Sequence, residues 1–135
     1  MKEENKSKQL KGIRGWLLVY VILLTFGFLW ALSLLYPMIS SFLNNSLSGK
    51  IAVILGVVGF VLGLNSIILI FQYSKKAILW NVYMLIYNII ATSIILLIFR
   101  RFEGILPILI GGLVNYGWIH YWLESKRVTN TFIEN

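Results

Sequence analysis

Side chains that could catalyse a reaction are scarce in this sequence of 135 residues. Cysteine and aspartate are absent, which excludes a thiolate nucleophile and leaves glutamate as the only carboxylate. The acidic residues all lie outside the long apolar stretches, at Glu3, Glu4, Glu103, Glu124 and Glu134. His120 is the single histidine, and its neighbours Trp118, Tyr121 and Trp122 favour a place in an interfacial aromatic belt over a proton relay. We therefore expect no enzyme, no cofactor and no metal site.

Side-chain amides are the main polar groups inside the apolar stretches. Asn81, Asn88 and Thr92 recur at intervals that keep them within about 40° of one another on a helix. Asn65 and Asn115 lie in two other apolar stretches. Amides in hydrocarbon form interhelical hydrogen bonds worth about 0.6 kcal/mol each. The alternative is a small polar cavity that binds an uncharged or cationic solute.

The elements that carry these amides are long and uncharged. The chain is 59% hydrophobic and only 13% charged, and a helix needs roughly 20 apolar residues to cross a bilayer. Uncharged stretches of this length occur at residues 16–36, 51–71, 77–99 and 105–123. We predict an all-α polytopic membrane protein with four transmembrane helices in a single domain, 1–135, flanked by tails at 1–15 and 124–135.

The first stretch also has features of a cleavable signal peptide. It follows basic residues and contains the small-x-small pattern Ala31-Leu32-Ser33. Its apolar run is about 21 residues, whereas signal peptides have an apolar region of about 7–15 residues. A retained helix is therefore the favoured interpretation.

Basic residues are distributed unevenly between the two sides that four crossings define. The side with both tails carries Lys2, Lys6, Lys8, Lys11, Arg14, Lys75, Lys76, Lys126 and Arg127. The opposite side carries Lys50, Arg100 and Arg101. Because short cytoplasmic loops carry the excess of Lys and Arg, both termini are predicted to be cytoplasmic. This topology accounts for the net charge of +7, so we expect the lipid bilayer and no nucleic acid as a partner.

Small residues form a candidate packing seam along the second stretch. They are Ala52, Gly56, Gly59, Gly63 and Ser66, and they lie within about 80° of arc. Gly59 and Gly63 form a GxxxG pair, which lets another backbone approach closely. The partner is either a helix of the same bundle, which is the simpler interpretation, or a second copy of the chain.

Neighbouring helices should bring the amides together in layers. Helices joined by short turns pack antiparallel, so residues equidistant from a turn come level. Asn88 and Asn115 are then level near the middle of the membrane, and Asn65 and Asn81 are level nearer the cytoplasm. We predict two intramembrane asparagine layers.

The two ends of the chain carry the most specific pattern. Residues 12–18 read GIRGWLL, and residues 121–132 read YWLESKRVTNTF. Together they resemble the YdgK-like family of small bacterial inner-membrane proteins, a domain of unknown function with four predicted spans. The matching positions are Gly12, Gly15, Trp16, Leu17, Tyr121, Ser125, Lys126, Arg127, Val128, Thr131 and Phe132. The resemblance implies a multi-pass protein of the bacterial inner membrane and no established activity.

This chain departs from the family pattern at two places. Proline is frequent in the family after the second span and before the final aromatic residues, where this chain has Ala77, Ile78 and His120. No role is therefore carried over to His120.

Both end segments fall on the predicted cytoplasmic face, where they form a candidate cytoplasmic motif. Basic residues of the tail hold the helix end at this face, and Phe132 could fold back into the interface as an anchor. Neither charge retention nor anchoring requires Ser125 or Thr131. The functional alternative is therefore that the tail forms a docking surface together with residues 12–16. We expect a non-enzymatic accessory or interaction protein that docks a membrane protein or another copy of itself. The alternative is an oligomeric small-solute transporter or channel whose path is lined by the asparagines.

Overall fold

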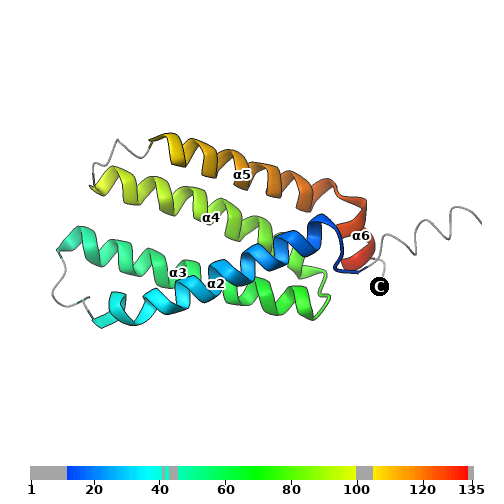
Figure 1. Cartoon of the computed structure of the whole chain (residues 1–135), viewed down its shortest axis with the longest axis horizontal. Coiled ribbons are helices and arrows are strands. Elements are labelled where there is room, and N and C mark those ends of the chain that lie inside the picture. The colour runs from blue at the N-terminus through cyan, green and yellow to red at the C-terminus, as the bar shows by residue number, and fades with distance from the viewer. Residues whose placement is uncertain (1–11, 41, 43–45, 100–104, 134–135) are drawn as a thin grey trace, which may run out of the picture.

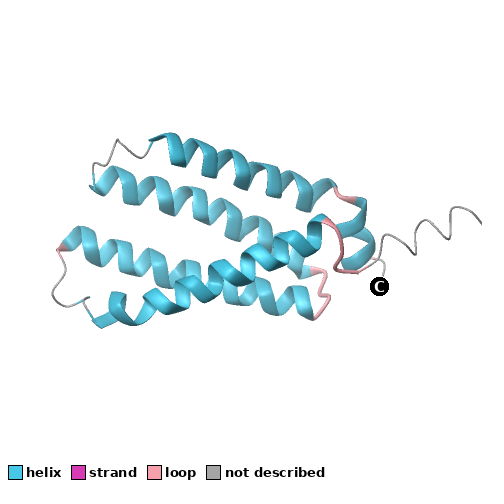
Figure 2. Cartoon of the chain, in the orientation of Figure 1, coloured by secondary structure: helices cyan, strands magenta, loops and turns pink. Residues whose placement is uncertain are grey.

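The structure is a computed structural model that describes residues 12–40, 42, 46–99 and 105–133. Within these residues the chain forms five α-helices and no strand, which confirms the predicted all-α class (Figures 1 and 2). The helices are α2 (Trp16–Ser40), α3 (Leu47–Phe71), α4 (Lys76–Phe99), α5 (Ile105–Glu124) and α6 (Lys126–Phe132). Several charged residues used in the sequence analysis lie outside the described residues: Lys2, Glu3, Glu4, Lys6, Lys8, Lys11, Arg100, Arg101, Glu103 and Glu134.

Three of the described helices are long and apolar enough to cross a membrane. They are Trp16–Leu34, Leu47–Phe71 and Lys76–Ile98. Large apolar side chains cover the outside of the helices, and Phe26 and Leu97 remain 69% and 70% exposed. These features indicate a membrane protein. The predicted fourth crossing, α5, does not meet the same criterion; its sequence contains Asn115 and His120.

Helix boundaries differ from the predicted ones by four residues at two ends and by one residue at two others. α2 continues beyond residue 36, through Pro37 to Ser40. Proline has no backbone N–H, so the carbonyl four residues earlier in the helix loses its usual hydrogen-bond donor. α3 begins at Leu47, four residues earlier than predicted, because Ser46 caps it by accepting a hydrogen bond from the Gly49 amide at 3.4 Å.

The four long helices form two hairpins that pack through α3 and α4 (Figure 1). α2 packs against α3, and α5 packs against α4. α6 turns across the end of the bundle where α2 begins and α5 ends, and it contacts α4 and α5 (Figure 1). We call this the α6 end. It comprises the start of α2, the turn between α3 and α4, the last turn of α5, and α6.

The core of the protein is concentrated at the α6 end. The hydrophobic side chains with at most 1% exposure there are Leu17, Ile70, Ala77, Trp122, Val128 and Phe132. Tyr73 lies in the turn between α3 and α4 and adopts a left-handed φ of 50°, which helps the chain to reverse direction within a few residues. The start of α2, the α3–α4 turn and α6 therefore share one core.

Candidate functional site

The two end segments of the chain meet at the α6 end. The Gly12 amide donates a hydrogen bond to the Thr131 hydroxyl oxygen at 3.0 Å, across 119 positions of sequence. Gly12 and Gly15 have φ angles of 87° and 58°, a region that glycine enters without steric cost. A methyl group at Gly15 would lie 3.9 Å from Nε of Arg127. We call Gly12, Gly15, Arg127 and Thr131 the terminal junction.

α6 is held in place by tertiary contacts. Seven residues are too few for a helix to be stable alone. Val128, Thr131 and Phe132 have the spacing that places side chains on one helix face, and they are 0%, 0% and 1% exposed. The Phe132 ring lies 5.6 Å from the Trp122 ring and 6.4 Å from the Tyr73 ring. Phe132 thus packs inside the protein at this end, where the sequence suggested an anchor in the lipid interface.

Other members of the candidate cytoplasmic motif remain accessible around the terminal junction. Trp16 is 68% exposed and Lys126 is exposed, whereas Tyr121, Ser125 and Arg127 are partly buried. Arg14, Lys75 and Lys76 are also exposed at this end. Glu124 is paired with His120 of the same helix at 3.1 Å. The surface around the junction is therefore aromatic and basic.

Asn81 links α4 to α2 in the buried part of the bundle. Its side chain is fully buried, its amide nitrogen donates to the Ala77 carbonyl, and its oxygen accepts from the Tyr20 hydroxyl, both at 2.8 Å. The sequence analysis placed Asn65 level with Asn81, but the hydrogen bonds of Asn81 go to Tyr20 and Ala77. The spacing of the amides did not single out Tyr20, although a tyrosine hydroxyl inside an apolar helix needs a hydrogen-bond partner.

Asn88 and Asn115 have different surroundings. Asn115 donates to the Gly111 carbonyl of its own helix at 2.8 Å. Asn88 is exposed on α4 and lines a cavity. No hydrogen bond joins the two amides in the described part of the chain.

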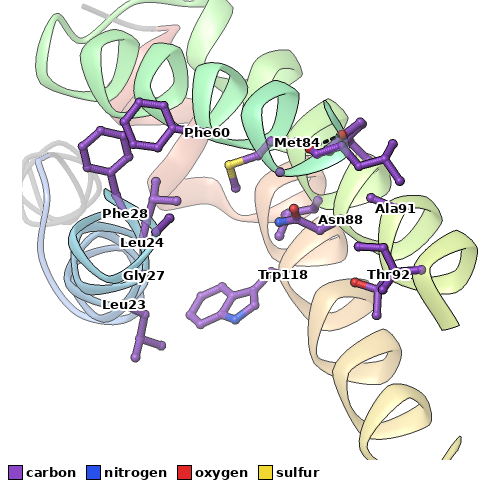
Figure 3. A pocket seen from close by; sticks show the side chains of 18 of the residues that line it. Leu23, Leu24, Gly27, Phe28, Phe60, Met84, Asn88, Ala91, Thr92 and Trp118 are labelled. Atoms are coloured by element: carbon purple, nitrogen blue, oxygen red, sulfur yellow. Dashed lines mark hydrogen bonds between the residues drawn. The ribbon is translucent and has the colours of Figure 1, made fainter. Parts of the chain in front are cut away.

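The cavity has a volume of about 470 Å³ and lies between α2, α3 and α4, with Trp118 of α5 at its edge (Figure 3). Leu23 and Gly27 of α2 lie on one side of this space, and Asn88 and Thr92 of α4 lie on the other (Figure 3). Most of the lining is apolar, and it contains no charged side chain. Of the four predicted amides, only Asn88 lines it.

The predicted packing seam faces other helices of the same chain. A methyl group at Gly63 would lie 4.0 Å from both Met84 Sδ of α4 and Phe28 Cδ2 of α2. At Gly59 it would lie 3.2 Å from Tyr87 Cε1 of α4. The other seam residues, Ala52, Gly56 and Ser66, are partly or fully buried. Gly59 and Gly63 thus lie where α3 packs against α4 and α2.

Among the described residues, no three His, Asp or Glu side chains lie close enough together to hold a metal ion. The chain matches no protein-family model, no curated protein and no solved structure. The candidate functional features of the described residues are the terminal junction and the cavity.

Proposed function

We propose that this chain is a non-enzymatic membrane protein of the YdgK-like type that docks a membrane-protein partner on the surface around its terminal junction. In this proposal it lies in a bacterial inner membrane, with both termini in the cytoplasm and four crossings. The single observation that carries the proposal is the hydrogen bond between Gly12 and Thr131. This contact unites the two end segments into one surface.

The same contact supports a fourth crossing. Gly12 precedes α2 and Thr131 follows α5, and two bonded groups must lie on the same side of a membrane. The number of crossings between them must then be even. If only α2, α3 and α4 crossed, the number would be three, which is odd, so α5 is the best candidate for the fourth crossing.

The construction of the junction supports docking of a protein over attraction to lipid headgroups. Headgroup attraction needs only basic charge near the surface. It does not need the left-handed glycines or the buried Thr131, which fix the shape of the surface. Exposed Trp16 and the basic residues around it suit an acidic cytoplasmic segment of the partner, because charge complementarity selects partners and register.

Photocrosslinking in the native membrane tests the proposal. A photoreactive residue replaces Arg14, which is exposed beside the junction, and adducts are identified by mass. We expect a discrete adduct with another protein. Its yield should fall about fivefold in Thr131→Val, because the lost acceptor weakens the junction by about 1 kcal/mol.

Thr129→Val is the matched control. The Thr129 hydroxyl donates to the Ser125 carbonyl of the same turn at 3.3 Å and takes no part in the junction. The adduct should persist in this variant. Adducts with lipid or with the chain itself, unchanged in Thr131→Val, would reject docking of a partner protein at this surface.

A further inference from the structure

We propose that the cavity between α2, α3 and α4 is a binding site for a small neutral molecule with an apolar body and at least one hydrogen-bonding group. This inference does not depend on the proposed docking function, because the cavity lies within the bundle and the terminal junction lies at its α6 end. The ligand is defined by the volume, the lining and the free polar groups of the cavity.

The volume and the lining restrict the ligand to a small neutral molecule. About 470 Å³ lies within the range of about 300–1,000 Å³ that is typical of small-molecule sites. Phe28, Phe60 and Met84 belong to its apolar walls. A charged solute would lose its hydration without finding a charged partner, because no charged side chain lines the cavity.

Two polar side chains give the site its hydrogen-bonding character. Asn88 and Thr92 are one helical turn apart, both are exposed, and both line the cavity. Neither side chain makes a hydrogen bond to another described residue. The other hydroxyls in the lining are engaged: Tyr20 donates to Asn81 at 2.8 Å, and Tyr87 donates to the Leu55 carbonyl at 2.6 Å.

The free groups favour a ligand that carries a hydroxyl or a carbonyl. An amide offers two donors and an acceptor, and a threonine hydroxyl offers one donor and two acceptor positions. Both residues lie within the Lys76–Ile98 segment that is apolar enough to cross a membrane, where an unsatisfied polar group is costly. A lipid tail could fill the space but would leave both groups unsatisfied.

Gly27 keeps the opposite side of the cavity open. A methyl group at this position would have no atom within 4 Å, and Gly27 lies across the space from Asn88 (Figure 3). A larger side chain here can therefore occupy the ligand's volume without displacing a neighbour. This gives a steric test that is separate from the polar one.

The test is photolabelling of the full chain in lipid nanodiscs with a trifluoromethyl-diazirinyl benzyl alcohol. The matched probe is the analogue that lacks the hydroxyl group. We expect the alcohol to label α2 and α4 residues of the cavity in a saturable manner. Asn88→Leu should reduce this saturable labelling about threefold or more, which is the effect of losing one average hydrogen bond in a membrane. Labelling by the analogue should be unchanged, which also shows that the variant is folded.

Two further variants complete the experiment. Gly27→Leu should abolish saturable labelling by both probes. Asn115→Leu is the control, because Asn115 is bonded to its own helix and does not line the cavity, and labelling should remain at the native level. Labelling that does not saturate, or an equal loss of both probes in Asn88→Leu, would overturn the proposal. Displacement of the alcohol by a brominated acyl chain alone would also overturn it and would assign the space to lipid.

Discussion

The hydrogen bond between Tyr20 and Asn81 is the buried polar contact that joins α2 to α4. Tyr20 is 4% exposed and Asn81 is fully buried, so water cannot replace a lost partner. The Tyr20 ring also makes edge-to-face contacts with Trp118 and Trp122, at centroid distances of 4.9 and 5.3 Å. Substitution by phenylalanine keeps these ring contacts and removes the hydroxyl alone.

Tyr20→Phe should therefore lower the free energy of unfolding by about 1 kcal/mol, since it leaves the Asn81 oxygen without a partner. The measurement is reversible unfolding in mixed detergent micelles. Tyr83→Phe is the control, because Tyr83 lies on the same helix as Asn81 but is 57% exposed. Equal stability of Tyr20→Phe and the native chain would mean that this hydrogen bond contributes nothing to folding.

Gly15 allows the chain to reach α6 before α2 begins. Its φ of 58° is left-handed, a conformation that costs an L-residue about 1–2 kcal/mol. Gly15→Ala should lower the free energy of unfolding by about 1 kcal/mol and speed amide exchange at residues 12–16. Gly117→Ala is the control, because Gly117 lies in the regular helix α5 with open space beside it. A larger loss of stability in Gly117→Ala than in Gly15→Ala would contradict the prediction.

At the scale of the helix, α6 depends on its burial more than on its sequence. Only its inward face of Val128, Thr131 and Phe132 is fully covered. Truncation of a buried phenylalanine to alanine typically costs about 3–5 kcal/mol, and a helix of this length does not persist without its contacts. The loss of Phe132 should therefore release the whole helix.

Limited trypsin digestion of the detergent-solubilised protein checks this expectation. In Phe132→Ala, cleavage after Lys126 or Arg127 should become at least about tenfold faster, because local unfolding exposes the backbone to the protease. Fragment masses distinguish this site from the exposed Lys75 and Lys76. Ile133→Ala provides the comparison, since Ile133 is 46% exposed. Equal cleavage of the two variants would show that Phe132 does not hold α6.

The long helices could be predicted from the sequence because a charged side chain is costly in hydrocarbon, so each membrane-length helix is visible as its own uncharged apolar stretch. α6 could not be predicted, because KRVTNTF has no apolar run of its own and becomes helical only through contacts with Trp122 and Tyr73.

For the amides, too, only part of the arrangement could be predicted from the sequence. Their depth follows from distances to the turns, but their partners depend on helix rotation, which leaves Asn81 beside Tyr20 and Asn115 bonded to Gly111. The cavity beside Asn88 depends on the packing of three helices and has no signal in any single segment.

At the scale of the whole molecule, the buried core lies at the α6 end of the bundle, and the cavity lies farther along it between α2, α3 and α4. The aromatic residues Tyr20, Trp118 and Trp122 pack together toward the α6 end, and Tyr20 and Trp118 also border the cavity. The terminal junction then ties the first and last described segments over this core. Because Gly12 and Thr131 are bonded, they must lie on the same side of a membrane, so the proposed topology depends on whether α5 crosses it.

Cysteine accessibility answers this question directly, because the native chain has no cysteine and each introduced thiol is unique. The variants are Leu47→Cys, Gln72→Cys and Glu124→Cys, all at exposed positions next to helix ends. With four crossings, a membrane-impermeant maleimide should label Leu47→Cys in intact cells. It should label Gln72→Cys and Glu124→Cys only after permeabilisation. If α5 did not cross, Glu124→Cys would be labelled in intact cells together with Leu47→Cys. That result would also be incompatible with the bond between Gly12 and Thr131, since Gly12 would then lie on the other side of the membrane from α6.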